Sequence, residues 1–100
     1  MRYYLNTSVS VGTTAVRVLP DREGLNIKRI SYVLQNISSA GQKITLSTGE
    51  TIAAGTGRTL SVGGSEDRTP DQYPTQTFIM AIADAAGGTL AVYEESEDIQ

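Results

Sequence analysis

Apolar and polar residues alternate along most of this 100-residue chain, in short runs separated by turn-forming residues. Five runs alternate with period two: residues 7–11, 15–19, 43–47, 58–62 and 89–93. This period predicts strands with one buried and one exposed face. Residues 30–34 and 77–83 are largely apolar at both parities, so we expect two central strands that are covered on both faces.

The stretch Lys28–Ser47 joins two of these runs and is expected to organise the sheet. Its middle, residues 38–41 (SSAG), consists of turn formers, which predicts a hairpin between the two strands. A second hairpin turn is expected at residues 84–88. The small residues and glycines of residues 52–57 predict a short strand with a tight bend.

The remaining segments are predicted to be irregular or terminal. Residues 63–76 hold two of the three prolines and almost no apolar side chain, which indicates a long loop that is functional, mobile or involved in contacts. Arg2–Asn6 fits either a first strand or an arm, residues 1–6, laid on a neighbouring subunit. The acidic residues 94–100 are expected to form a frayed tail.

These elements predict one all-β domain over residues 1–100. We expect a single small antiparallel β-sandwich or jelly-roll-like barrel of about eight strands, because short strands recur with turn signals between them. No segment predicts a helix. The predicted core consists of Val16, Val18, Ile30, Tyr32, Leu34, Ile44, Leu46, Leu60, Phe78, Met80, Ile82, Leu90 and Val92.

The composition narrows the chemistry that the chain could perform. It contains no Cys, no His and no Trp, which excludes disulfide, thiolate and imidazole chemistry. Without histidine, no serine or threonine has a visible base to activate it. We therefore expect a non-enzymatic protein.

Charge is divided unevenly along the chain. Residues 1–43 carry six basic and two acidic side chains (+4), and residues 44–100 carry two basic and nine acidic ones (−7), which together give −3. Either folding mixes the two halves, or the molecule is polar and docks one end on a charged partner. The few, scattered basic residues argue against nucleic acid as a partner, and no apolar run is long enough for a membrane partner.

Three patterns resemble chemical sites but lack features that such sites need. Gly55–Thr59 resembles a phosphate loop, but it lacks the lysine and the following helix. The carboxylate pairs, Glu66 with Asp67 and Glu94 with Glu95, are expected to be solvated charge. The acidic residues that could ligate calcium are Asp67, Asp71 and Asp84, whose spacing matches no calcium loop. No cofactor or metal site is predicted.

The order of the turns and strand ends resembles that of the small β-sandwich proteins of bacteriophage virions, which include capsid decoration (cement) proteins and spike or fibre components. The segments that carry the resemblance are Val9–Ala15, Leu19-Pro20, the loop with Arg22, Leu34–Asn36, Ile44–Ser47 with Gly49, Ala54–Gly57, Leu60, Gly63–Ser65, Ala81–Asp84 and Gly87–Val92. These segments span nearly the whole chain, and the resemblance indicates a structural family but no chemical activity.

This resemblance implies a decoration protein on the capsid surface of the virion, where it binds and stabilises major capsid subunits as a homotrimer or homodimer. Tyrosine and arginine are enriched at interfaces. The expected contact residues are Arg2, Tyr3, Tyr4, Arg22 and Tyr73. Two alternatives stay open: a spike or host-attachment module whose 63–76 loop binds a glycan or receptor, and a carbohydrate-binding module outside any virion.

Overall fold

A computed structural model describes residues 1–49 and 53–99 of the chain, nearly all of them in strands, turns and short loops. In chain order the elements are β1 (Arg2–Val11), β2 (Val16–Leu19), β3 (Ile27–Asn36), β4 (Ile44–Thr48), β5 (Arg58–Leu60), β6 (Ser65–Arg68), the 3₁₀ turn η1 (Pro70–Gln72), β7 (Ile79–Ala83) and β8 (Gly88–Asp98). Among the described residues, no helix is long and apolar enough to cross a membrane.

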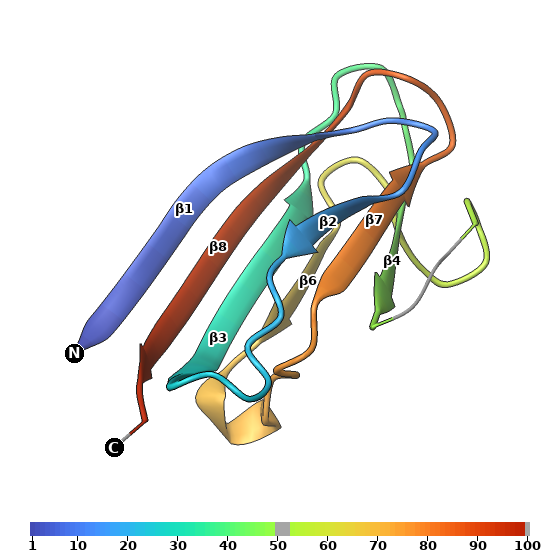
Figure 1. The fold of residues 1–100 in the computed structure, drawn as a ribbon. Coiled ribbons are helices and arrows are strands. Elements are labelled where there is room, and N and C mark those ends of the chain that lie inside the picture. Colours follow the sequence, from blue (N-terminus) through green and yellow to red (C-terminus); the bar gives the residue numbers. More distant parts are fainter. Residues whose placement is uncertain (50–52, 100) are drawn as a thin grey trace.

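The strands form two antiparallel four-stranded sheets (Figure 1). The long sheet has the order β1-β8-β3-β6, and the short sheet has the order β2-β7-β4-β5. The first strand pairs with the eighth, the second with the seventh, the third with the sixth and the fourth with the fifth. This nested pairing is the connectivity of a jelly roll. The predicted all-β sandwich of about eight strands is therefore confirmed.

The predicted hairpin over Lys28–Ser47 is wrong, because β3 lies in the long sheet and β4 in the short one. Buried Asn36 holds the crossover between them. Its Nδ2 donates to the carbonyls of Gln42 (2.7 Å) and Leu60 (2.9 Å), while its Oδ1 accepts the backbone N–H of Ser38 (3.0 Å). Residues 84–88, predicted as a second hairpin, also cross between sheets, from β7 to β8.

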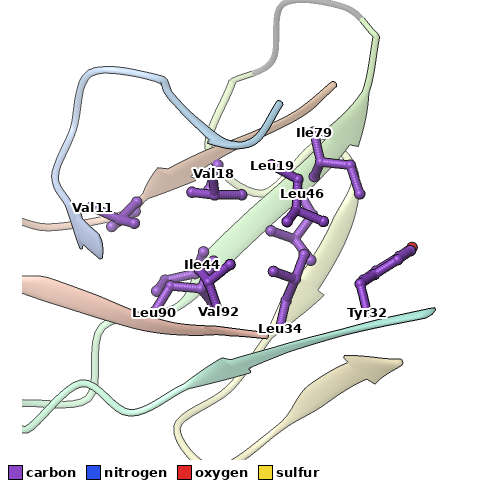
Figure 2. Close-up of a cluster of buried hydrophobic side chains, with 12 residues drawn as sticks. Val11, Val18, Leu19, Tyr32, Leu34, Ile44, Leu46, Ile79, Leu90 and Val92 are labelled. Carbon is purple, nitrogen blue, oxygen red and sulfur yellow. The ribbon is translucent and has the colours of Figure 1, made fainter. Parts of the chain in front are cut away.

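Side chains from the inner faces of both sheets meet in one apolar cluster (Figure 2). Nine predicted core residues are buried: Val18, Ile30, Tyr32, Leu34, Ile44, Leu46, Ile82, Leu90 and Val92. Val16 and Leu60 lie partly buried at its margin. Val11, which is absent from the predicted core, is also buried in the cluster.

The predicted face of β7 is wrong. Ile79, Ala81 and Ala83 fill the cluster, whereas Phe78 and Met80 are only partly buried. Because this run is apolar at both parities, its pattern could not select a face. Phe78 instead receives the guanidinium of Arg17 at 4.0 Å from its ring centroid, a cation–π contact outside the core.

Irregular registers explain two further differences. A register shift between Arg17 and Leu19 lets both Val18 and Leu19 enter the core, although they are neighbours in one strand. Strand β3 is central within its sheet, as predicted, but its outer face is uncovered and leaves Val33 38% exposed. The prediction that this strand is covered on both faces is therefore wrong.

The two sheets differ in length, and this difference shapes the molecule. Strands β1, β3 and β8 have 10, 10 and 11 residues, whereas those of the short sheet have three to five. Figure 1 shows the three long strands running side by side to the end that holds both termini. There, residues 2–8 of β1 are all exposed.

Two segments predicted as irregular are ordered. The expected acidic tail continues β8 as far as Asp98, and Glu94 and Ser96 within it are buried. The expected loop of residues 63–76 contains β6 and η1. A short strand with a tight bend was predicted over residues 52–57. Residue 52 lies outside the described residues, and residues 53–57 form turns that lead into β5.

Candidate binding surface

The outer face of the long sheet, turned away from the short sheet, carries cross-strand rows of side chains. In one row Asn6 of β1 lies opposite Tyr93 of β8, which lies opposite Val33 of β3. In the next row Ala91 of β8 lies opposite Gln35 of β3. Because alanine is small, the face is hollowed there.

The hollow is an open groove of about 330 Å³. It is lined by Asn6, Val33, Gln35, Ala91, Val92 and Tyr93. None of these residues is charged. An aromatic ring and two amides around an apolar floor suit contact with a protein surface or with a neutral polar ligand.

A charged row closes this face at the end that holds the termini. Arg2 donates to Glu95 (2.8 Å) and Glu97 (3.3 Å), and Lys28 lies opposite Glu97. The basic N-terminal half therefore pairs with the acidic C-terminal half. Of the two interpretations of the charge division, the mixing of the halves by folding is the one seen.

Tyr3 and Tyr4, both expected contact residues, point to opposite faces of β1. Tyr4 shares the outer face with Asn6 and is 65% exposed. Tyr3 lies on the inner face, 41% exposed, with its hydroxyl donating to Asp98 at 3.1 Å. Beyond the reach of the short sheet, this edge strand presents an aromatic ring on each face.

Arg22, the fourth expected contact residue, belongs to an internal ion-pair network. Its Nη2 lies 2.6 Å from Oε1 of Glu94, whose Oε2 accepts from Nε of Arg29 at 2.6 Å. Arg29 is fully buried and also donates to the carbonyls of Pro20 and Thr75. The network fastens the loop that follows β2 and the loop that precedes β7 to the inner face of the long sheet.

A second buried carboxylate, Glu66, lies in the same layer. It accepts from Nε of Arg58 at 2.5 Å and from the hydroxyl of Tyr32 at 2.7 Å. Burial, together with the hydrogen bond to Glu66, raises the pKa of Tyr32 to about 12. The prediction that Glu66 and Glu94 are solvated is wrong. For Glu94 the available signal was its position in phase with buried Leu90 and Val92 of the same strand, whereas β6 has no other buried residue that could mark Glu66.

Acid is expected to destabilise the protein through these two carboxylates. Burial raises the pKa of Glu66 and Glu94, but hydrogen bonds and charge from the adjacent arginines outweigh it, so both pKa values lie below the ordinary one. A depressed carboxyl pKa stabilises the fold above the unfolded-state pKa of about 4.3, and this contribution is lost as pH falls through the folded-state pKa.

Urea unfolding at a series of pH values tests this expectation. The free energy of unfolding should be nearly constant from neutral pH to about pH 5 and fall steeply below about pH 4. An unfolding free energy that stays level down to pH 3 would contradict the pairing of these carboxylates.

Tyr73, the last expected contact residue, lies apart from the others. It caps η1 with a left-handed backbone (φ 52°) and is 89% exposed. It follows β6, the edge of the long sheet opposite to β1. The fold thus gathers Arg2, Tyr3 and Tyr4 on one strand and separates them from Arg22 and Tyr73.

The groove residues Asn6, Gln35 and Tyr93 were not singled out from the sequence. Their strands alternate, so an outward direction was readable for Tyr93, whose neighbours Val92 and Glu94 face inward. Which outward residues become neighbours depends on the pairing of β1, β8 and β3, which are distant in the sequence.

Among the described residues, the three sequence patterns that resemble chemical sites do not come together as sites. Within residues 1–49 and 53–99, no group of three acidic side chains is placed to hold a metal ion. The glycines of Gly55–Thr59 lead into strand β5, and Arg58 is engaged by Glu66.

Comparison with known proteins adds no relative. The chain matches no model of a protein family, and no curated protein is significantly similar to it.

Proposed function

We propose that this chain is a non-enzymatic accessory protein of a bacteriophage virion, which decorates the capsid by docking on major capsid subunits. The proposal places the docking surface on the outer face of the long sheet. The resemblance in turn and strand-end sequence motivates the virion role. One structural observation supports the location: an uncharged groove lined by Tyr93 on the outer face of the sheet, which also carries exposed Tyr4.

The physical character of this face suits a protein partner. Interfaces are enriched in tyrosine and depleted of charge at their centre, with charged residues at the rim. Here Tyr93 and the groove occupy the centre, while Arg2, Glu95 and Glu97 form one charged border, where Tyr4 lies opposite Glu95. The jelly roll adds support by analogy alone, since viral capsid domains use it but so do lectins and cupins.

Capsids produced without the protein provide the test. Purified chain should co-sediment with them, and Tyr4→Ser combined with Tyr93→Ser should weaken binding by about tenfold or more, because tyrosines commonly dominate an interface. Tyr73→Ser is the matched control, since it removes an exposed tyrosine from the opposite edge. Failure to bind, together with capsids that keep their stability without the protein, would refute the decoration role.

The groove also favours a second candidate, a spike or receptor-binding module that takes a neutral glycan. A tyrosine ring beside two amides offers a stacking face and hydrogen bonds. Copy number separates the two roles: hundreds of copies per particle support decoration, and a few copies at vertices or tail support a spike. Loss of binding in Tyr73→Ser alone would move the contact to the 63–76 loop.

A further inference from the structure

Strand β1 is an unguarded edge of the long sheet. Its ten residues, RYYLNTSVSV, contain no proline and no charge after Arg2, and its register with β8 is unbroken. The opposite edge, β6, has charged residues at three of its four positions, and the edge strands of the short sheet have four and three residues. Proteins usually block long edges with charge, proline or bulges, because free edges attract other strands.

The pairing of β1 with β8 decides which residues of β1 have free backbone N–H and C=O groups. The carbonyl of Met1 accepts from the N–H of Asp98, and Arg2 lies opposite Glu97. Residues of an antiparallel strand bond alternately to either side. The odd residues of β1 therefore bond to β8, and the even residues present free N–H and C=O groups at the edge. The even residues are Arg2, Tyr4, Asn6, Ser8 and Ser10.

We propose that β1 pairs antiparallel with β1 of a second copy of this chain, with Asn6 on the two-fold axis. The five residues with free backbone groups are centred on Asn6, so only one register pairs all five. In this register the residue numbers of each facing pair add up to 12. Arg2 then faces Ser10 of the second copy, Tyr4 faces Ser8, and Asn6 faces Asn6. Two hydrogen bonds for each of the five pairs give about ten across the interface.

The side chains of β1 are compatible with this register. No pair opposes two like charges, since Arg2 faces a serine. On the inner face, Tyr3 comes to lie opposite Val9 of the second copy, and Leu5 opposite Thr7. Tyr3 and Leu5 are 41% and 38% exposed in one copy, and Val9 packs at the margin of the core cluster. Pairing therefore covers exposed apolar surface and extends each core.

Self-pairing also joins the outer faces of the two copies. The row of Val33, Tyr93 and Asn6 continues across the axis into Asn6, Tyr93 and Val33 of the second copy. The two grooves then lie on one face of an eight-stranded sheet. This dimer does not depend on the virion role, because it concerns the purified chain alone, but it would double the proposed docking surface.

Single cysteines test the register directly, because the chain has no cysteine of its own. Cα atoms of a hydrogen-bonded antiparallel pair lie about 5.5 Å apart, which a disulfide spans. Asn6→Cys should therefore form a disulfide-linked dimer under mild oxidation. Ser8→Cys is the matched control on the same strand and face, since its own copy would lie four residues away, about 13 Å along the strand. Equal crosslinking of both variants, or none with Asn6→Cys, would overturn the proposal.

Proline at the axis provides a second test without crosslinking. Asn6 has its N–H at the free edge, so Asn6→Pro removes a donor that the second copy needs and β8 does not. Sedimentation of the 10.7 kDa chain should show dimers for the natural sequence and for Asn6→Ala, with at least about tenfold weaker association for Asn6→Pro. The far-ultraviolet spectrum should stay the same.

Two results would contradict this second expectation: a natural chain that stays monomeric at every concentration, or an Asn6→Pro variant that dimerises normally. If the natural chain is a monomer, the inference about a second copy is overturned. If in addition Asn6→Pro abolishes binding to capsids while Asn6→Ala still binds, the edge takes a strand of a capsid subunit. If the chain dimerises but does not bind capsids, the dimer stands and the proposed function fails.

Discussion

Glu94→Gln is expected to lower the free energy of unfolding by about 3–5 kcal/mol, because it leaves the charge of buried Arg29 without its partner. Arg29 is fully buried, and its Nε lies 2.6 Å from the Glu94 carboxylate. The substitution keeps the size of the side chain, so the loss reports on charge. Arg22, which is partly exposed, also loses its carboxylate but can rehydrate.

Glu95→Gln is the matched control for this prediction. Glu95 is the next residue along β8, points to the opposite face and pairs with exposed Arg2. An exposed ion pair contributes about 0–1 kcal/mol, so urea unfolding should show little change. Equal losses in the two variants would show that the buried network does not carry the stability assigned to it.

Asn36→Asp is expected to cost about 3 kcal/mol or more, since it removes two buried donors and introduces a charge without a cationic partner. Nδ2 of Asn36 donates hydrogen bonds to the carbonyls of Gln42 and Leu60, and the residue is fully buried. A carboxylate there would face two carbonyl oxygens. Because Asn36 holds the crossover between the sheets, this loss should appear as a lowered midpoint of cooperative thermal unfolding.

The neighbouring residue supplies the control. Gln35→Glu makes the same amide-to-acid change on the exposed outer face, where water solvates the charge, and surface changes usually stay within about 0.5 kcal/mol. If Asn36→Asp is as stable as Gln35→Glu, the crossover does not rely on the Asn36 amide. The same Gln35 variant introduces a charge into the groove, so its effect on capsid binding is informative as well.

The buried ion pairs hold the two sheets and their loops together, whereas the outer face of the long sheet is available for contacts. Arg29 with Glu94, and Arg58 with Glu66, attach loops and the second sheet to the inner face of the long sheet. On the outer face, the side chains of Tyr4, Asn6 and Tyr93 make no hydrogen bond to another of the described residues. Polar groups without internal partners on a hydrogen-bonded sheet are available to a partner, and holding them in place on the sheet lowers the entropy cost of binding.

The sequence alone determined the fold class and most strand positions. Alternation of side chains is a local property, so the buried parity of β8 was readable from Leu90 and Val92 without knowledge of the pairing. The absence of cysteine and histidine likewise restricted the available chemistry without any structure. The sequence also predicted Tyr3 and Tyr4 as contact residues, and the structure leaves both exposed on one strand.

Only the tertiary structure decided which strands share a sheet and which charges are buried. Turn residues such as those at 38–41 fit a hairpin and a crossover equally well. In the crossover, the Asn36 amide donates to the carbonyls of nearby Gln42 and of Leu60, 24 residues away. Glu94 became a buried ion because Arg29, 65 residues away in the chain, reaches it across paired strands. The groove and the free edge of β1 arise in the same way, since both are products of long-range pairing that no local period encodes.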